Sequence, residues 1–469
     1  MLFYKKLGLI FFLGVYFSSN SLFAQNINAG TGSIVSVKVE SIISGKIIES
    51  VNEDLLMTPA STLKAASTVM ALEILGSNYS FVTELYSRGT VNNGVLKGDL
   101  IIKGAGDPTL GSKYFSSTSA QKVISFIHSE LNKAGIRQIT GDIYIDESLF
   151  AANKYPDGRL WEDMANYYGA APSALTWCDN TFTLVLSSGD EPGSFCNVVE
   201  TIPALRNIDF TSTVKAVAGN KDSAYIYGYP GLRKWELRGS MPLGRSSFRI
   251  KGSLPFPGMH FGYELASGFS NNTYNPEVIV VNKSYDYSKL NKVTEIVSPK
   301  VGDIIKVINH RSVNLFADHL FLALTKANFY SWDNSRELFY DFWESRVSMP
   351  YIRILDGSGL SPLNLVTTGF MVDVLKYAYL SSNFDVFKSS LAVGGQQGTI
   401  SGMWKHASDR GRVYAKSGYM KGTLAYCGYI YTPKNDVLVF SILVNNMTAD
   451  LNTVRAGIES YVSLLINRY

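Results

Sequence analysis

Three short motifs, far apart along the chain, constrain its fold more than any other feature. They are Ser61-Thr-Leu-Lys64, Ser312-Val-Asn314 and Lys416-Ser-Gly418. In this order they form the signature of serine enzymes that activate the nucleophile with a lysine and not with a histidine. Helical and strand patterns at both ends of the chain flank a long middle segment, so we expect one discontinuous catalytic domain that contains all three motifs.

The first motif predicts a serine in the first turn of a buried helix. Thr58-Pro59-Ala60 precedes Ser61, a mostly apolar run follows, and Gly76 ends it, which is typical of a helix with a capped start and a glycine stop. Residues three apart share a helix face, so Ser61 Oγ and Lys64 Nζ can approach hydrogen-bonding distance. Burial and a neighbouring cation, for which Lys416 is the candidate, would lower the pKa of Lys64 and let it accept the serine proton. Alone, the match also fits an ordinary helix start with a solvated lysine.

The second motif lies where an amphipathic helix is expected to give way to a loop. A serine hydroxyl and an asparagine amide two residues apart can face the same cleft. Ser312 would then pass a proton to a leaving amine, and Asn314 would hydrogen-bond the backbone amide of a substrate. Taken alone, the tripeptide is also typical of a turn with a helix cap.

The third motif lies in the first of two predicted strands joined by a tight turn. A strand at the edge of a cleft would offer a cation at Lys416, a hydroxyl at Ser417 and a close approach to the backbone at Gly418. This combination suits a substrate with a free carboxylate. The backbone N–H groups of Ser61 and Tyr419 would then form the oxyanion hole. An exposed lysine on an edge strand is the alternative interpretation of the isolated tripeptide.

With these motifs the chain resembles the penicillin-binding protein 4 family, the class C low-molecular-mass D-alanyl-D-alanine carboxypeptidases and endopeptidases. The resemblance includes the wide gap between the first and second motifs. It also includes four further segments: Gly104-Ala-Gly-Asp-Pro108, Trp161-Glu-Asp-Met164, Asp356-Gly-Ser-Gly-Leu-Ser361 and Gly394-Gly-Gln-Gln-Gly-Thr399. It implies an α/β (α+β) serine β-lactamase/penicillin-binding transpeptidase-like fold, in which helices cover an antiparallel sheet. It further implies a penicillin-inhibited DD-peptidase that acts on peptidoglycan stem peptides through a Ser61 acyl-enzyme, without a cofactor.

The chain departs from the family pattern at three positions. Ser417 stands where the family usually has threonine and keeps the hydroxyl, whereas Val313 removes a carboxylate from the usual Ser-Asp-Asn. Pro362 stands where family members often have an arginine that grips the carboxylate of a diaminopimelate side chain. Asp163 matches a family aspartate that contacts the amino group of that side chain, and a surface carboxylate without a role in binding is the alternative interpretation. The resemblance therefore leaves open the third stem residue, and it does not separate carboxypeptidase from endopeptidase action.

The N-terminus predicts export. Lys5-Lys6, an apolar run and a polar stretch ending at Ala24 are typical of a secretory signal peptide over residues 1–24, cleaved after Ala24. The apolar run is too short to anchor the mature chain in a membrane. The two lysines contribute two of the four net positive charges of the whole chain, so the mature chain is near neutral and no nucleic-acid partner is expected. We therefore expect a periplasmic protein.

The domain organisation follows from these patterns. Residues 25–85 and 286–469 are expected to form the catalytic domain, and residues 86–285, with short strands and frequent turn residues, to form inserted β-rich domains. The clearest predicted elements of the catalytic domain are a hairpin over 33–50, a buried strand over 437–445 and an amphipathic helix over 450–467.

The cysteines and histidines suggest neither a disulfide scaffold nor a metal site. A hairpin over 181–200 would pair Cys196 with a residue close to Leu186 and away from Cys178, which disfavours a bridge between the two cysteines. Cys427 lies in an apolar strand and is expected in the core. The histidines are scattered without ligand spacing, so no metal is predicted.

Two other functions are alternatives to the DD-peptidase. A β-lactamase is disfavoured because no plausible counterpart of its glutamate loop or Tyr-x-Asn motif is found. A non-catalytic wall-binding protein on the same fold is disfavoured because it would have no reason to keep all five chemical residues, which are Ser61, Lys64, Ser312, Asn314 and Lys416. The sequence does not fix the oligomeric state.

Overall fold

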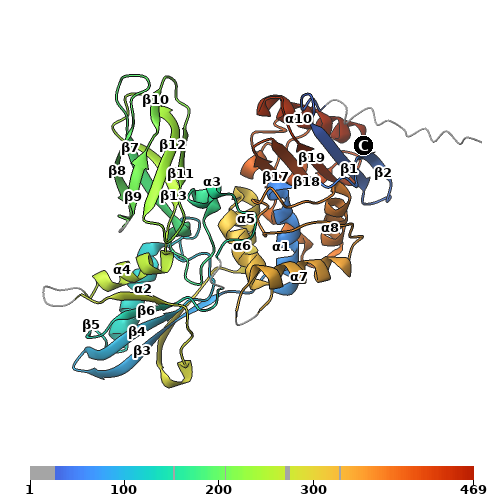
Figure 1. Ribbon diagram of the computed structural model, residues 1–469. Coiled ribbons are helices and arrows are strands. Elements are labelled where there is room, and N and C mark those ends of the chain that lie inside the picture. The colour runs from blue at the N-terminus through green and yellow to red at the C-terminus, as the bar shows by residue number, and fades with distance from the viewer. Residues whose placement is uncertain (1–26, 151–153, 206–207, 270–274, 327–328) are drawn as a thin grey trace, which may run out of the picture.

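A computed structural model describes residues 27–150, 154–205, 208–269, 275–326 and 329–469. In it the N-terminal hairpin and the C-terminal strands form one sheet (Figure 1). The strand order is β16-β17-β18-β19-β1-β2, and every neighbouring pair is antiparallel. The N-terminal hairpin therefore extends a sheet whose other strands come from the last eighty residues of the chain. The strands are β1 (Ile34–Ser41), β2 (Ile47–Val51), β16 (Ala392–Val393), β17 (Val413–Met420), β18 (Thr423–Tyr431) and β19 (Val437–Asn445).

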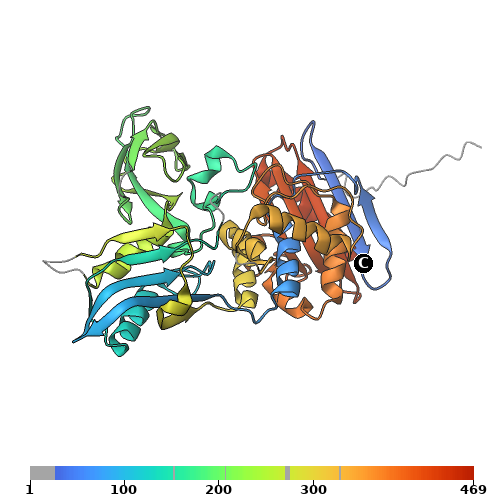
Figure 2. The same cartoon turned by 60° about the horizontal axis from the view of Figure 1, so that its bottom comes forward.

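Helices cover both faces of this sheet, and Figure 2 shows one helical layer in front of it. Along β19, Val439 and Leu443 pack into the core that contains α1 and α8, whereas Phe440 and Ile442 pack into the core that contains α10. Because β19 is buried on both faces, its sequence is a nearly continuous apolar run. The helices are α1 (Leu63–Ile74), α5 (Val301–Arg311), α6 (Asn314–Ala323), α7 (Trp332–Glu344), α8 (Thr368–Leu380), α9 (Phe384–Ser390) and α10 (Leu451–Arg468).

The middle of the chain forms a second sheet beside the catalytic domain (Figure 1). Its order is β14-β6-β4-β3-β15, with β5 beside β4, and α2 and α4 pack on it around a separate apolar core. The elements are β3 (Val82–Asn92), β4 (Val95–Lys103), α2 (Ala120–Lys133), β5 (Gln138–Ile139), β6 (Ile143–Asp146), α4 (Pro257–Ser267), β14 (Val278–Val281) and β15 (Asn291–Val297).

A third unit, made of strands, is inserted within the second. Two small sheets, β13-β7-β8 and β10-β12-β11 with β9 beside β12, enclose a core that includes Phe182 and Trp235. The strands are β7 (Thr181–Ser187), β8 (Asn197–Ile202), β9 (Asp209–Ser212), β10 (Lys215–Val217), β11 (Ser223–Tyr227), β12 (Lys234–Pro242) and β13 (Phe248–Ser253). The segment that joins β6 to this unit carries the short helix α3 (Trp161–Met164) and the 3-10 turn η3 (Tyr167–Gly169).

The predicted catalytic elements are confirmed. The strand over 437–445 is β19, the hairpin is β1 with β2, and the C-terminal helix is α10 with Asp450 as its N-cap. The inserted sheet begins at Val82 and ends at Val297, a wider span than the expected 86–285, because β15 pairs with β3 before the chain returns to the catalytic domain.

The cysteines are unbridged, because the β7–β8 hairpin pairs Leu186 with Val198 and so places Cys196 at the opposite end of β7 from Cys178. The predicted signal peptide over residues 1–24, with its cleavage after Ala24, lies outside the described residues. Among the described residues, no helix is both long and apolar enough to cross a membrane.

Candidate active site

Ser61 lies in a tight turn that leads into α1. The turn is the 3-10 segment η2 (Ala60–Thr62), and Ala60 has a φ of +46°, which residues other than glycine rarely adopt. The sheet holds this turn in place, because the Thr58 N–H donates a 2.7 Å hydrogen bond to the side-chain oxygen of Asn445 at the end of β19. The Ser61 hydroxyl therefore lies at the positive end of α1. The sheet stabilises the unusual backbone conformation of Ala60, the residue directly before it.

Lys64 is completely buried and contacts three oxygens. Its Nζ lies 2.8 Å from Ser61 Oγ, 2.6 Å from Asn314 Oδ1 and 2.5 Å from the Ser358 carbonyl oxygen. The amide oxygen and the carbonyl oxygen can only accept hydrogen bonds. A neutral amine has two N–H groups and one lone pair, so when the N–H groups serve these two acceptors the lone pair is directed at Ser61 Oγ. This arrangement is the one that a base for the serine proton needs.

Burial lowers the pKa of Lys64 from 10.5 to about 7, against the opposing charges of Asp318 and Asp356 and with a further lowering by Arg159. At neutral pH a large fraction of this amine is therefore unprotonated. Lys416 is also fully buried, and its pKa is lowered well below its usual value, first by burial and then by the charge of Lys64. The charge of Lys64 therefore disfavours protonation of Lys416, whereas the cation that lowers the pKa of Lys64 is Arg159 and not the predicted Lys416.

Both ends of the Asn314 amide are used within the protein. Its Oδ1 accepts from Lys64, and its Nδ2 donates to the Tyr168 carbonyl oxygen at 2.9 Å. The Tyr168 carbonyl can only accept, so it fixes the direction of the amide. The sequence predicts a bond from Asn314 to substrate instead. In this structure Asn314 orients the Lys64 amine. This role depends on Tyr168 in η3, which lies outside the motif.

Ser312 occupies the break between α5 and α6. Its φ of +57° ends α5 at Arg311, and α6 begins at Asn314, so the predicted transition from helix to loop is a short break followed by a second helix. Lys416 Nζ donates to Ser312 Oγ at 3.0 Å and to the Ser417 carbonyl oxygen at 2.6 Å. The second and third motifs are therefore in direct contact.

The end of β17 has one open edge. The Val413 carbonyl accepts from the Gly394 N–H on the side away from β18. Backbone groups alternate between the two sides along a strand, so the Tyr419 N–H points to the same side as Val413. There β16 pairs with β17 only at Tyr414 and Ala415. The Tyr419 N–H is thus directed at the open edge, where an oxyanion-hole donor has to be.

Gly418 lets β17 lie against the nucleophile turn. A Cβ at this position would lie 2.9 Å from both the Ser61 backbone nitrogen and the Pro59 carbonyl oxygen. The sequence predicts that substrate approaches the backbone at Gly418. The structure adds an approach of two backbone segments that only glycine permits.

Substituting alanine for Gly418 is expected to slow acylation of Ser61 by about a hundredfold, because displacement of a nucleophile by about 1 Å can have that effect. The control is Gly402→Ala, since a Cβ there meets nothing within 4 Å. The rate of covalent labelling by a fluorescent penicillin measures both. Equal rates for the two variants would show that the close approach is unimportant.

The Ser417 hydroxyl donates to the Thr399 hydroxyl at 2.6 Å. Thr399 lies in the 3-10 turn η6 (Gly398–Ile400), at the end of the glycine-rich segment that is part of the family resemblance. Two hydroxyls therefore lie side by side next to the buried Lys416, as recognition of a carboxylate would require.

A buried ion cluster, not predicted from the sequence, influences the pKa of the catalytic-motif lysine. Arg159 Nη2 lies 2.9 Å from an Asp318 oxygen and 3.5 Å from an Asp356 oxygen, and no side chain of the three is more than 1% exposed. Asp356 also accepts from the Gly359 N–H at 2.7 Å, and so shapes the loop that carries the Ser358 carbonyl. The three charged residues come from three separate segments, which no short motif connects.

Asp163 and Pro362 border the site. Asp163 lies in α3, and burial raises its pKa to about 6 despite Arg159 and a hydrogen bond from the Tyr168 side chain. Because the Tyr168 carbonyl accepts from Asn314, Asp163 is connected to the site through one residue. The carbonyl of Pro362 accepts from the Thr58 hydroxyl at 3.1 Å, which places the proline beside the nucleophile turn.

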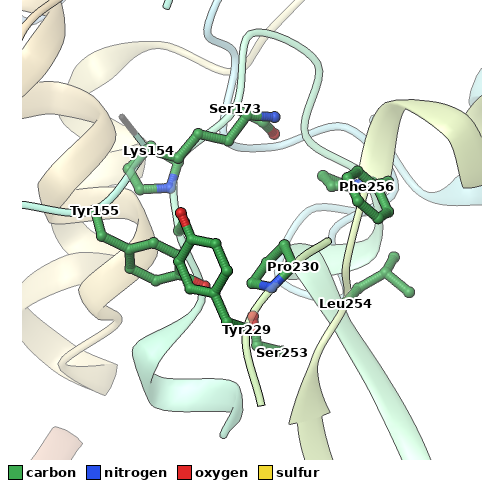
Figure 3. A pocket seen from close by; sticks show the side chains of 11 residues that line it. Lys154, Tyr155, Ser173, Tyr229, Pro230, Ser253, Leu254 and Phe256 are labelled. Carbon is green, nitrogen blue, oxygen red and sulfur yellow. The ribbon is translucent and has the colours of Figure 1, made fainter. Parts of the chain in front are cut away.

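A cavity of about 150 Å³ lies where the inserted units meet the segment that carries α3 (Figure 3). The rings of Tyr155 and Tyr229 lie 5.6 Å apart in its wall, and Figure 3 shows Lys154 and Ser173 above them. No residue of the three motifs lines this cavity.

The comparisons with known proteins agree with this geometry. A model of the D-Ala-D-Ala carboxypeptidase 3 (S13) family matches residues 22–465 of the chain. The D-alanyl-D-alanine carboxypeptidase DacB of Haemophilus influenzae is 27% identical, over 97% of this chain and 96% of that protein. The D-alanyl-D-alanine carboxypeptidase of Actinomadura sp. is 26% identical, over 88% of this chain and 78% of that protein.

Solved structures show the same fold. The crystal structure of penicillin binding protein 4 from Haemophilus influenzae superposes with a TM-score of 0.79 at 23% identity and covers 95% of this chain and 98% of that one. A predatory peptidoglycan endopeptidase from Bdellovibrio bacteriovorus superposes with a TM-score of 0.51 at 19% identity, over 92% of both chains.

Proposed function

Because the chain belongs to the D-Ala-D-Ala carboxypeptidase 3 (S13) family, we propose that it is a serine DD-peptidase that cleaves peptidoglycan stem peptides through an acyl-enzyme. The observation that carries the chemistry is the 2.8 Å distance between Lys64 Nζ and Ser61 Oγ, with the two other contacts of Nζ made to oxygens that only accept. Lys64 takes the proton while Ser61 attacks the carbonyl carbon of the penultimate D-alanine. The N–H groups of Ser61 and Tyr419 stabilise the oxyanion.

The second half of the acylation step uses the contact between Ser312 and Lys416. The departing amine needs a proton, and Ser312 Oγ is the donor, with its own proton restored through Lys416 at 3.0 Å. Lys416 and the Ser417 hydroxyl hold the carboxylate of the leaving group, whose negative charge favours the protonated form of Lys416. After the amine has left, Lys64 releases the serine proton to solvent and Lys416 recovers a proton from solvent. Water then attacks the ester with the neutral Lys64 as the base, and Ser61 Oγ leaves with a proton from Lys64.

The physiological setting follows from the chemistry. Stem peptides lie outside the cytoplasmic membrane, so the enzyme acts in the periplasm after removal of residues 1–24. β-Lactams mimic the D-Ala-D-Ala end and acylate Ser61. By its correspondence to the family aspartate, Asp163 contacts the amino group of the third stem residue. Its carboxyl accepts a hydrogen bond from the Tyr168 side chain, and the Tyr168 carbonyl accepts from Asn314.

Incubation of the purified mature protein with a fluorescent penicillin, beside Ser61→Ala, tests the acyl-enzyme. A persistent label on the wild type that is absent from the variant is expected, together with release of D-alanine from a pentapeptide or separation of a cross-linked dimer. A wild type that is neither labelled nor active on either substrate would refute the function. Rapid hydrolysis of penicillin in solution would favour a β-lactamase.

The pH dependence of acylation reports on Lys64. Because the neutral amine is the base and its pKa is about 7, the second-order rate of penicillin labelling is expected to rise between pH 5.5 and 8 and to be half-maximal near pH 7. The sign follows from loss of the lysine proton as the pH rises. A rate that stays constant or falls across this range would exclude Lys64 as the base.

A further inference from the structure

A groove of about 820 Å³ runs along α5, outside the three motifs. α5 lies on the side of the catalytic domain that faces the inserted units (Figure 1). The opposite wall includes Tyr114 and Phe115, whose rings pack on Phe316 of α6. This wall is therefore anchored to the catalytic helices.

The groove is positively charged. Lys300, Lys306 and Arg311 line it against a single acid, Asp303. Lys306 and Arg311 are exposed and form no ion pair within the part of the chain that the structure describes. The pKa of His310 is lowered first by burial and also by the charges of these two cations. The groove thus has unpaired cations with a neutral histidine between them at pH 7, which is an environment suited to carboxylates.

One end of the groove adjoins the place where the leaving group is bound. Arg311 directly precedes Ser312, the proposed proton donor to the leaving amine. The His310 carbonyl oxygen would lie 3.3 Å from a Cβ at Gly398, so α5 touches η6, whose Thr399 accepts from Ser417. The carboxylate side of the catalytic site therefore continues into the basic groove.

We propose that this groove binds the stem peptide that leaves when the enzyme cleaves a D-Ala cross-link, with Lys306 and Arg311 paired to its carboxylates. The inference rests on the proposed function and adds a substrate preference to it. In carboxypeptidase action the leaving group is a single D-alanine, which contacts only Lys416 and Ser417. In cleavage of a cross-link the leaving group is a whole stem peptide, which extends further and carries additional carboxylates. Lys306 lies five residues before Arg311, about 7.5 Å along the helix axis, which only the longer leaving group reaches.

The test compares two substrates with one protein. The ratio of kcat/KM for a purified cross-linked stem-peptide dimer to that for a pentapeptide is measured for the wild type and for Lys306→Gln/Arg311→Gln. We expect the ratio to fall roughly tenfold in the double variant, the loss expected for two partly exposed ion pairs. In the wild type, added salt should lower cleavage of the dimer more than that of the pentapeptide.

The control replaces two exposed lysines outside the groove, Lys46→Gln/Lys122→Gln, and should keep the wild-type ratio. An unchanged ratio in the groove variant, or an equal fall in the control, overturns the proposal. If the double variant does not fold, Lys306→Gln alone and the salt dependence of the wild type give the same comparison. A wild type that cleaves neither substrate and takes no penicillin label would refute the proposed function instead, so the two failures are distinguishable.

Discussion

Replacing Lys64 with methionine is expected to reduce acylation of Ser61 by about a thousandfold while the protein remains folded. A positioned general base contributes typically about 10² to 10⁴ in rate, and the only amine within hydrogen-bonding distance of Ser61 Oγ in the described residues is that of Lys64. Methionine has a similar length and no charge, so it fills the buried space. The rate constant for labelling by a fluorescent penicillin at pH 8 measures the loss.

The folded state should tolerate this change. Loss of the amine leaves the oxygens of Asn314 and Ser358 without their donor, which costs about 1 to 3 kcal/mol each at most. Removal of a fully buried ionisable group offsets part of that cost. A melting temperature far below that of the wild type would mean that Lys64 mainly supports the fold.

A matched variant separates the base from the positive charge. Lys64→Arg keeps a cation, but a guanidinium does not lose its proton at neutral pH, so this variant should be as inactive as Lys64→Met. If Lys64→Arg retained substantial activity, the residue would act through its charge. If Lys64→Met were labelled within tenfold of the wild-type rate, another group would be the base.

Local sequence rules were sufficient to place the nucleophile and its partner. Ser61 and Lys64 are three residues apart at the start of a helix, and this spacing alone brings Oγ and Nζ together. The strand that carries Lys416, and the turn that follows it, could also be predicted, because apolar residues are typical of such strands and glycine of such turns. The family assignment and the DD-peptidase function drawn from the motifs are confirmed by the match over residues 22–465.

The role of Asn314 could not be predicted from its motif. Its contacts depend on the Tyr168 carbonyl, which lies 146 residues away in the sequence. The same applies to the Ser358 carbonyl, 294 residues from Lys64. A backbone carbonyl leaves no trace in the amino-acid type, so only the fold reveals that Lys64 has two acceptors besides the serine.

The largest expected effect on stability comes from Arg159→Met. The variant leaves Asp318 and Asp356 buried without their cation, and breaking a buried ion pair in this way costs about 3 to 5 kcal/mol. Burial already raises the pKa of Asp318 to about 6 against the opposing charge of Arg159. We therefore expect a clear fall in the free energy of unfolding, measured with urea at pH 7. The control is Arg233→Met, because Arg233 pairs with Asp209 on the surface, where such pairs contribute at most about 1 kcal/mol.

Arg159→Met should also shift the pH profile, which a purely structural role would not require. Arg159 lowers the pKa of Lys64, whereas Asp318 and Asp356 raise it. Without Arg159, protonated Lys64 is the remaining counter-ion of the two aspartates, so its pKa is expected to rise. The pH range over which the acylation rate increases should therefore move to higher pH. The double variant Arg159→Met/Asp318→Asn removes one buried charge and should recover part of both losses. If stability falls but this pH range stays near pH 7, then Arg159 supports the fold without tuning the base.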